Sequence, residues 1–191
     1  MTKAFIVSLL ISWAGLGDKD AKVNVDESTV EWVGKKVTGQ HNGTIQLQGG
    51  RLEMDDNGNL TGGIFTIDMS SITCLDLSGE YKGKLEGHLK SDDFFGVEKY
   101  PTSTFTITKA VPQGPGKYKI VGNITIKGTT EEIQFPANVE VKDGKVTATA
   151  DITIDRSKFD VRYGSGSFFD NLGDKTIYDN FDLSVKLVAY M

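Results

Sequence analysis

The feature that most constrains the fold is a two-residue alternation of apolar and polar side chains, which runs through most of the chain after about residue 22. For example, Val146, Ala148 and Ala150 alternate with Thr147 and Thr149. A period of two places every second side chain on one face of a β-strand. Each stretch of this kind is therefore predicted to be a strand with one apolar and one polar face.

Turn-forming residues separate these stretches, as in 55–59, 114–116 and Asp143-Gly144. Such residues supply the backbone angles that short hairpin loops need, and short loops join antiparallel neighbours. The inward set that begins at Ile133 is predicted to run as far as Val141. In the first half, strands are expected near residues 22–25, 28–37, 40–48, 50–55 and 60–69.

One stretch, residues 78–89, breaks the two-residue pattern. Apolar positions three and four apart predict a helix whose contact face contains Leu77, Tyr81, Leu85, His88 and Leu89. Ser78 is positioned to cap it. Its two internal glycines each cost about 1 kcal/mol relative to alanine, so the helix is expected to depend on docking against the strands, as a lid or plug.

Many strands that each have one apolar face close most economically into a barrel, because closure removes exposed sheet edges. The predicted fold class is therefore all-β, an eight-stranded antiparallel β-barrel with one short helix. Inward positions mix small residues such as Gly122 and Ala137 with large ones such as Phe105 and Phe135. That mixture fits a barrel that holds a small ligand and equally fits one filled by its own side chains.

The first 17 residues have the layout of a secretory signal peptide: Lys3, an apolar run over 4–14, and small residues at 15–17. The run is too short to span a bilayer comfortably. We therefore expect residues 18–191 to form the mature domain of a periplasmic or secreted protein. An N-terminal strand or helix of the domain is the alternative interpretation.

Charge and cysteine content exclude several functions. A net charge of -5 argues against a nucleic-acid partner, whose phosphates are neutralised by Lys and Arg. The single cysteine, Cys74, cannot form an internal disulfide and is expected to be a small buried side chain. Two histidines far apart and one cysteine match no recognised ligand spacing, so neither a metal nor a cofactor is expected.

Several motifs resemble the YceI-like family, often called polyisoprenoid-binding proteins, over about residues 23–190. They include Glu31-Trp32 leading into 39–43, and the block 85–105. That block pairs a helix ending in His88-Leu89 with Ser-x-Asp-Phe-Phe and then Tyr-Pro at the start of a strand. Gly96 departs from the family, which usually has an acidic residue there.

The resemblance implies an extended, lipocalin-like barrel that is exported, often forms a homodimer, and holds an isoprenoid-type lipid in its bore without catalysis. His41, His88, Ser91 and Arg156 are candidates to meet a polar headgroup, with Asp68 as an orienting partner. The side chains expected to contact the lipid are Phe65, Ile67, Leu85, His88, Leu89, Phe94, Phe95, Phe105, Ile107, Phe135, Arg156 and Phe159.

Two other functions stay open. A hydrolase would use His88 with Asp92 or Asp93 as acid and base, or Ser91 as nucleophile, although no nucleophile elbow is present. A filled barrel would serve as an interaction or stress-response module. His88 and Arg156 also have structural interpretations. His88 would be a packing histidine, and Arg156 would clamp Asp155, Asp160 or a carbonyl group.

Overall fold

The structure, a computed structural model, describes residues 19–191, so the predicted signal peptide at 1–17 lies outside the described residues. Within them the chain forms nine strands, one α-helix and two short 3-10 helices. The elements are β1 (Lys19–Val23), β2 (Thr29–Lys36), β3 (Gly39–Met54), β4 (Leu60–Cys74), α1 (Gly79–Lys90), β5 (Thr102–Gly114), β6 (Lys117–Ile126), β7 (Thr129–Lys142), β8 (Lys145–Asp155), η1 (Arg156–Phe159), η2 (Gly173–Lys175) and β9 (Ile177–Tyr190).

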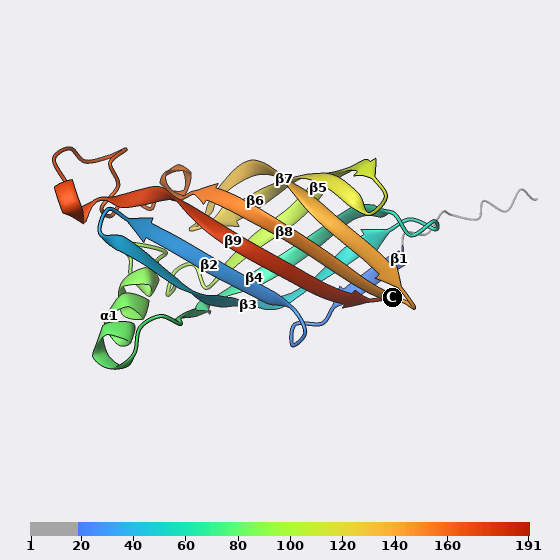
Figure 1. Cartoon of the computed structure of the whole chain (residues 1–191), viewed down its shortest axis with the longest axis horizontal. Coiled ribbons are helices and arrows are strands. Elements are labelled where there is room, and N and C mark those ends of the chain that lie inside the picture. Colours follow the sequence, from blue (N-terminus) through green and yellow to red (C-terminus); the bar gives the residue numbers. More distant parts are fainter. Residues whose placement is uncertain (1–18) are drawn as a thin grey trace, which may run out of the picture.

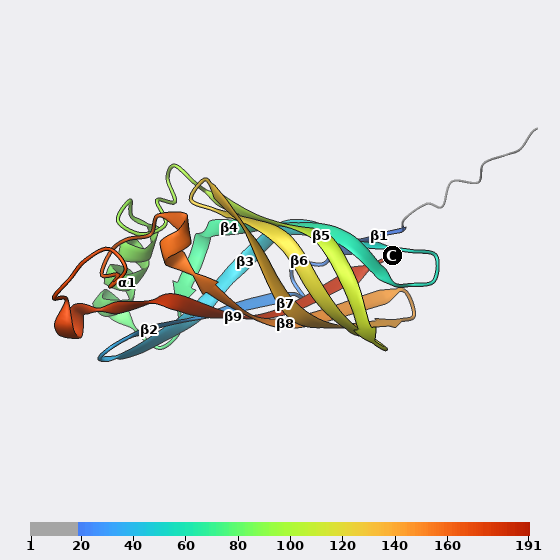
Figure 2. The ribbon, with the colours of Figure 1, turned by 90° about the horizontal axis from the view of Figure 1, so that it is seen from above.

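The strands close into an eight-stranded antiparallel barrel, which confirms the predicted fold class. Closure comes from pairing of β3 with β4 and of β2 with β9. The ninth strand adds no extra position around the barrel, because β1 pairs with β3 and β9, the same two neighbours that flank β2. Figures 1 and 2 show an elongated barrel with α1 at one end.

The predicted break between strands 40–48 and 50–55 is wrong, because β3 continues through Gly49 and Gly50. Its pairing with β4 instead shifts register between Leu47 and Gly49, as in a β-bulge. A side chain at Gly50 would place its Cβ 2.7 Å from the carbonyl oxygen of Ile64. The glycine therefore marks a close approach of two strands and not a turn.

Inward and outward faces follow the predicted alternation closely. On β6, Tyr118, Ile120, Ile124 and Ile126 are all buried, whereas Lys119, Asn123 and Thr125 are more exposed. Val141 keeps the predicted inward parity, because it pairs with the buried Val146, but it is 39% exposed. It lies next to the β7–β8 turn, and this place at the end of the hairpin accounts for its exposure.

Gly122 of β6 is required by its neighbour across the sheet, the ring of Phe105. A Cβ there would lie 2.5 Å from Phe105 Cζ and 2.5 Å from the Thr106 carbonyl oxygen. We expect Gly122→Ala to lower the free energy of unfolding by about 1–3 kcal/mol through overpacking. Gly34→Ala, where a Cβ meets nothing within 4 Å, is the matched control in urea denaturation. Equal stability of the two variants would contradict this assignment.

Both apolar packing, through Leu89, and polar contacts hold helix α1 against the barrel. The Glu86 carboxylate accepts hydrogen bonds from Thr73 Oγ1 (2.7 Å) and from the backbone N–H of Cys74 (2.8 Å), and these bonds lower the pKa of Glu86. The predicted contact face is only partly correct, because Tyr81 is 74% exposed. Ser78 occupies the cap position, but its side chain makes no capping hydrogen bond.

Between residues 19 and 191, the structure has no helix that is both long enough and apolar enough to cross a membrane.

Candidate functional site

The barrel interior contains two adjoining apolar cavities, so it is not filled by its own side chains. Cavity 1, of about 330 Å³, lies at the end that carries α1, and Leu85, His88 and Leu89 of that helix contribute to its wall. Cavity 2, of about 110 Å³, lies further along the bore. The two share four lining residues, namely Val30, Ile67, Ile124 and Leu183.

Eleven of the twelve side chains expected to contact a lipid line these cavities. Cavity 1 is lined by Ile67, Leu85, His88, Leu89, Phe94, Phe95 and Arg156. Cavity 2 is lined by Phe65, Ile67, Phe105, Ile107 and Phe135. Phe159 lines neither. It is 1% exposed and packs in the core with Ile154 and Val161, so no ligand contact is expected from it.

Several lining residues of cavity 1 were not among the sequence-based candidates. Tyr163 comes from the irregular segment after β8, where no periodicity indicates which side chains point inward. Trp32 was recognised only as part of a family motif, although its even spacing from Val30 on β2 places both on one face. The further residues include Ile45, Met69, Ile72, Ile177 and Phe181.

His88 brings an unpaired polar atom to the wall of cavity 1. Its ring packs edge-on against Tyr163, with ring centroids 4.3 Å apart, and against Phe94, at 5.7 Å. Its Nε2 atom is buried and has no hydrogen-bond partner among the described residues. The packing interpretation is thus correct for the ring but leaves one nitrogen unsatisfied. Because an unsatisfied buried polar atom is costly, a ligand that bonds to it gains from the contact.

Arg156 is the clamp that the structural interpretation predicted. Its side chain is 2% exposed, and its guanidinium donates to the carbonyl oxygens of Val161 (2.7 Å), Ile177 (2.9 Å) and Tyr178 (3.2 Å). Burial lowers the pKa of Arg156, while the carboxylate of Asp179, 3.4 Å from Nη2, favours the charged form. The donors are therefore committed to backbone groups, although the side chain lines cavity 1.

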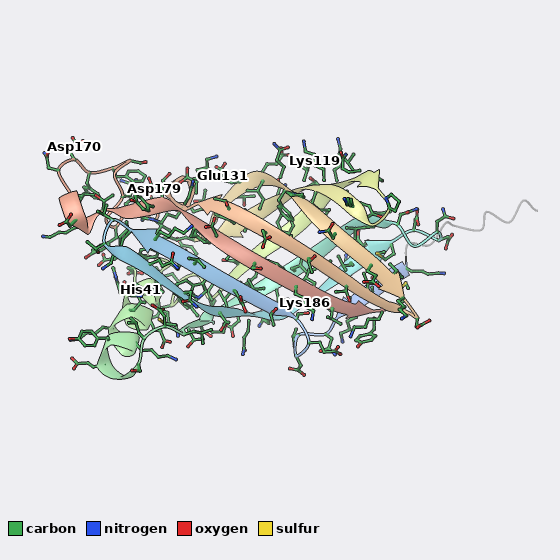
Figure 3. The ribbon with its side chains drawn as sticks, in the orientation of Figure 1. His41, Lys119, Glu131, Asp170, Asp179 and Lys186 are labelled. Carbon is green, nitrogen blue, oxygen red and sulfur yellow. The ribbon has the colours of Figure 1, made fainter. Side chains whose placement is uncertain are left out.

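The remaining headgroup candidates are engaged elsewhere or lie off the cavities. Asp68 accepts hydrogen bonds from Ser70, and the Ser91 hydroxyl donates to the carbonyl oxygen of His88. His41 lines cavity 1, and its Nδ1 contacts Asp76 at 2.8 Å. Figure 3 shows His41 at the end of the barrel that carries α1.

The groups that the hydrolase hypothesis needs do not form a catalytic arrangement in residues 19–191. Asp92 pairs with Lys99 at 2.8 Å, and both side chains are 66% exposed. No hydrogen bond joins His88 to Asp92 or Asp93 in the described chain. The Ser91 hydroxyl, directed at a backbone carbonyl, has no base beside it.

A family model described as the YceI-like domain matches residues 22–189, nearly the whole described chain. The chain belongs to the YceI-like family. Among curated relatives, a UPF0312 protein of Vibrio vulnificus is 40% identical over 50 residues, and one of Staphylococcus aureus is 46% identical over 50 residues. Each alignment covers 26% of this chain and 26% of the relative, so the chain spans about a quarter of the length of the curated relatives it matches.

Solved structures resemble this YceI-like protein over most of its length. BcnA of Burkholderia cenocepacia has a TM-score of 0.72 and 25% identity, covering 87% of this chain and 99% of that one. A polyisoprenoid binding domain from Saccharophagus degradans has a TM-score of 0.64 and 13% identity, covering 89% and 97%. The YCEI protein of Campylobacter jejuni has a TM-score of 0.57 and 21% identity, covering 100% and 90%. The last two show likeness of fold alone.

Proposed function

We propose that this protein binds one amphiphilic isoprenoid-type lipid, polyprenyl or quinone-like, in its bore and carries it without catalysis. The observation that carries the proposal is the pair of adjoining apolar cavities inside the closed barrel. Cavity 1 lies within the range of about 300–1,000 Å³ common for small-molecule sites. The polyisoprenoid binding described for the Saccharophagus degradans domain supports the choice of lipid class.

The tail occupies cavity 2 and the inner part of cavity 1 in this proposal. Cavity 2 is lined by aliphatic and aromatic side chains, with Thr149 as its one polar lining residue. Each five-carbon prenyl unit buried there contributes up to about 4 kcal/mol, at roughly 0.8 kcal/mol per carbon. Ordering the chain offsets part of that gain, so affinity rises with the number of prenyl units that fit.

The headgroup lies near His88, because its Nε2 is a buried polar atom that lacks a partner in the described chain. A hydroxyl or carbonyl on the lipid completes that hydrogen bond, since a neutral imidazole offers one donor and one acceptor. Trp32 lines the same cavity and is a convenient fluorescent reporter of occupancy. We also propose that the protein is exported to the periplasm or the medium. As the resemblance to the family implies, we propose that it forms a homodimer.

His88→Phe tests the headgroup position, because phenylalanine keeps the edge-on packing and removes the nitrogen. Delipidated protein is titrated with a polyprenol and with the matching hydrocarbon that lacks the hydroxyl. We expect the wild type to prefer the alcohol by about threefold to tenfold, the value of one hydrogen bond, and the variant to lose that preference. A preference unchanged in the variant would place the headgroup elsewhere.

A further inference from the structure

A second group of polar side chains lies outside the proposed lipid contacts, at the junction of β3, β4 and the loop before α1. It consists of His41, Cys74 and Asp76. His41 Nδ1 is 2.8 Å from one carboxylate oxygen of Asp76, and Cys74 Sγ is 3.1 Å from the other. The three ligand-type atoms all lie within 4.8 Å of one another.

Strand register brings these three residues together. Gly43 of β3 pairs with Cys74 at the end of β4. The ladder continues past the strand, because the Leu75 N–H donates to the Asn42 carbonyl oxygen at 2.9 Å. One further step brings His41 opposite Asp76, whose carboxylate also accepts the Asn42 N–H at 3.1 Å. The backbone therefore holds the group in place before any ligand binds.

We propose that His41, Cys74 and Asp76 bind a Zn²⁺ ion, with a fourth position left for water or an added ligand. Thiolate, imidazole and carboxylate are the side chains that zinc prefers, and three protein ligands with one open position are typical of non-structural zinc sites. Bond lengths of about 2.3 Å to sulfur and 2.0 Å to nitrogen separate those atoms by about 3.5 Å in a tetrahedron. The three atoms already lie within 4.8 Å of one another, so side-chain movements on the order of 1 Å bring them to that geometry.

Zinc binding at this group is coupled to the release of a proton. Zinc binds a thiolate and not a thiol, so Cys74 gives up its proton when the ion binds. On binding, the S–H bond breaks, sulfur keeps the electron pair and bonds to zinc, and one proton passes to solvent.

Access to the site is from the solvent side. Cys74 is fully buried, but the side chains of His41 and Asp76 are 30% and 31% exposed. His41 also lines cavity 1, so a bound ion lies beside the mouth of the bore. The three proposed zinc ligands are in place whether or not a lipid occupies the bore. Spacing along the sequence predicted no metal site, because the three residues meet only through the register of β3 and β4.

The test is direct titration of the chelator-treated, full-length protein with Zn²⁺ by calorimetry. We expect one ion per chain and release of about one proton, measured as a dependence of the observed heat on the buffer. Co²⁺ in place of Zn²⁺ should give a thiolate-to-cobalt absorption band. Even residues that only orient a ligand cost about 10–100-fold in metal affinity, so His41→Ala and Asp76→Asn should each weaken binding by more than about 100-fold.

Asp93→Asn, which changes an exposed carboxylate outside the group, is the control and should bind Zn²⁺ as the wild type does. Circular dichroism checks that each variant is folded. Cys74→Ala should abolish the cobalt band; if its fold is lost, His41→Ala decides, because that side chain is partly exposed. Absence of stoichiometric zinc, or binding unchanged in His41→Ala, would overturn the proposal.

Discussion

Ala150→Phe is expected to weaken binding of a long-chain prenyl lipid by about a hundredfold or more, while leaving the free energy of unfolding unchanged or higher. Ala150 lines cavity 2, and a benzyl group at this position occupies the space proposed for the end of the tail. Excluding one prenyl unit removes up to about 4 kcal/mol of apolar burial. Filling a void adds packing contacts, in contrast to truncation of a core side chain.

The matched control is Asp151→Phe, which adds the same ring to the next, outward-facing position of β8. Fluorescence titration with polyprenols of increasing length measures both variants. The wild type and Asp151→Phe should gain affinity with each added prenyl unit, whereas Ala150→Phe should stop gaining once the chain reaches cavity 2. Equal affinities of Ala150→Phe and wild type for every chain length would show that the tail does not enter this cavity.

Arg156→Met is expected to lower the free energy of unfolding by about 3–5 kcal/mol, the largest loss that we predict for any single substitution. The change removes the hydrogen bonds to three backbone carbonyl oxygens and leaves Asp179, a largely buried carboxylate, without its cation. Losing one partner of a buried ion pair is costly, because the other charge stays buried. Urea denaturation followed by circular dichroism measures the effect.

Two further substitutions distinguish the clamp from charge alone. Arg162→Met removes an exposed guanidinium that pairs with Asp160, and it should change stability by less than about 1 kcal/mol. Arg156→Lys keeps the positive charge but cannot reach three carbonyl groups from one planar fork, so its loss should be intermediate. If Arg156→Met were as stable as Arg162→Met, the clamp would have no structural importance.

The barrel itself could be predicted from the sequence, because the alternation of side chains reports directly which face of each strand is buried. The continuity of β3 could not be predicted, because Gly49-Gly50 has the sequence of a turn. In the structure it forms a β-bulge, at which two strands approach closely. The exposure of Val141 could not be predicted either, because it depends on how close the residue lies to the β7–β8 turn and the alternation reports only its face.

Only the part of the candidate site that lies on regular strands could be predicted from the sequence. Phe65, Ile67, Phe105, Ile107 and Phe135 were predictable because their strand parity points them inward. Tyr163 was not, because it lies in an irregular segment, and Phe159 was misplaced because a short 3-10 helix follows β8 there. The meeting of His41 with Cys74 and Asp76 was also invisible, because it depends on the register between two long strands.

Native mass spectrometry of the protein purified from its own host without detergent decides whether the bore holds a lipid. We expect a population heavier than the polypeptide by one prenyl-type lipid, which organic extraction releases and added polyprenol restores. A protein that carries no such mass, and that takes up no polyprenol after extraction, would contradict the claim that this barrel is a lipid carrier.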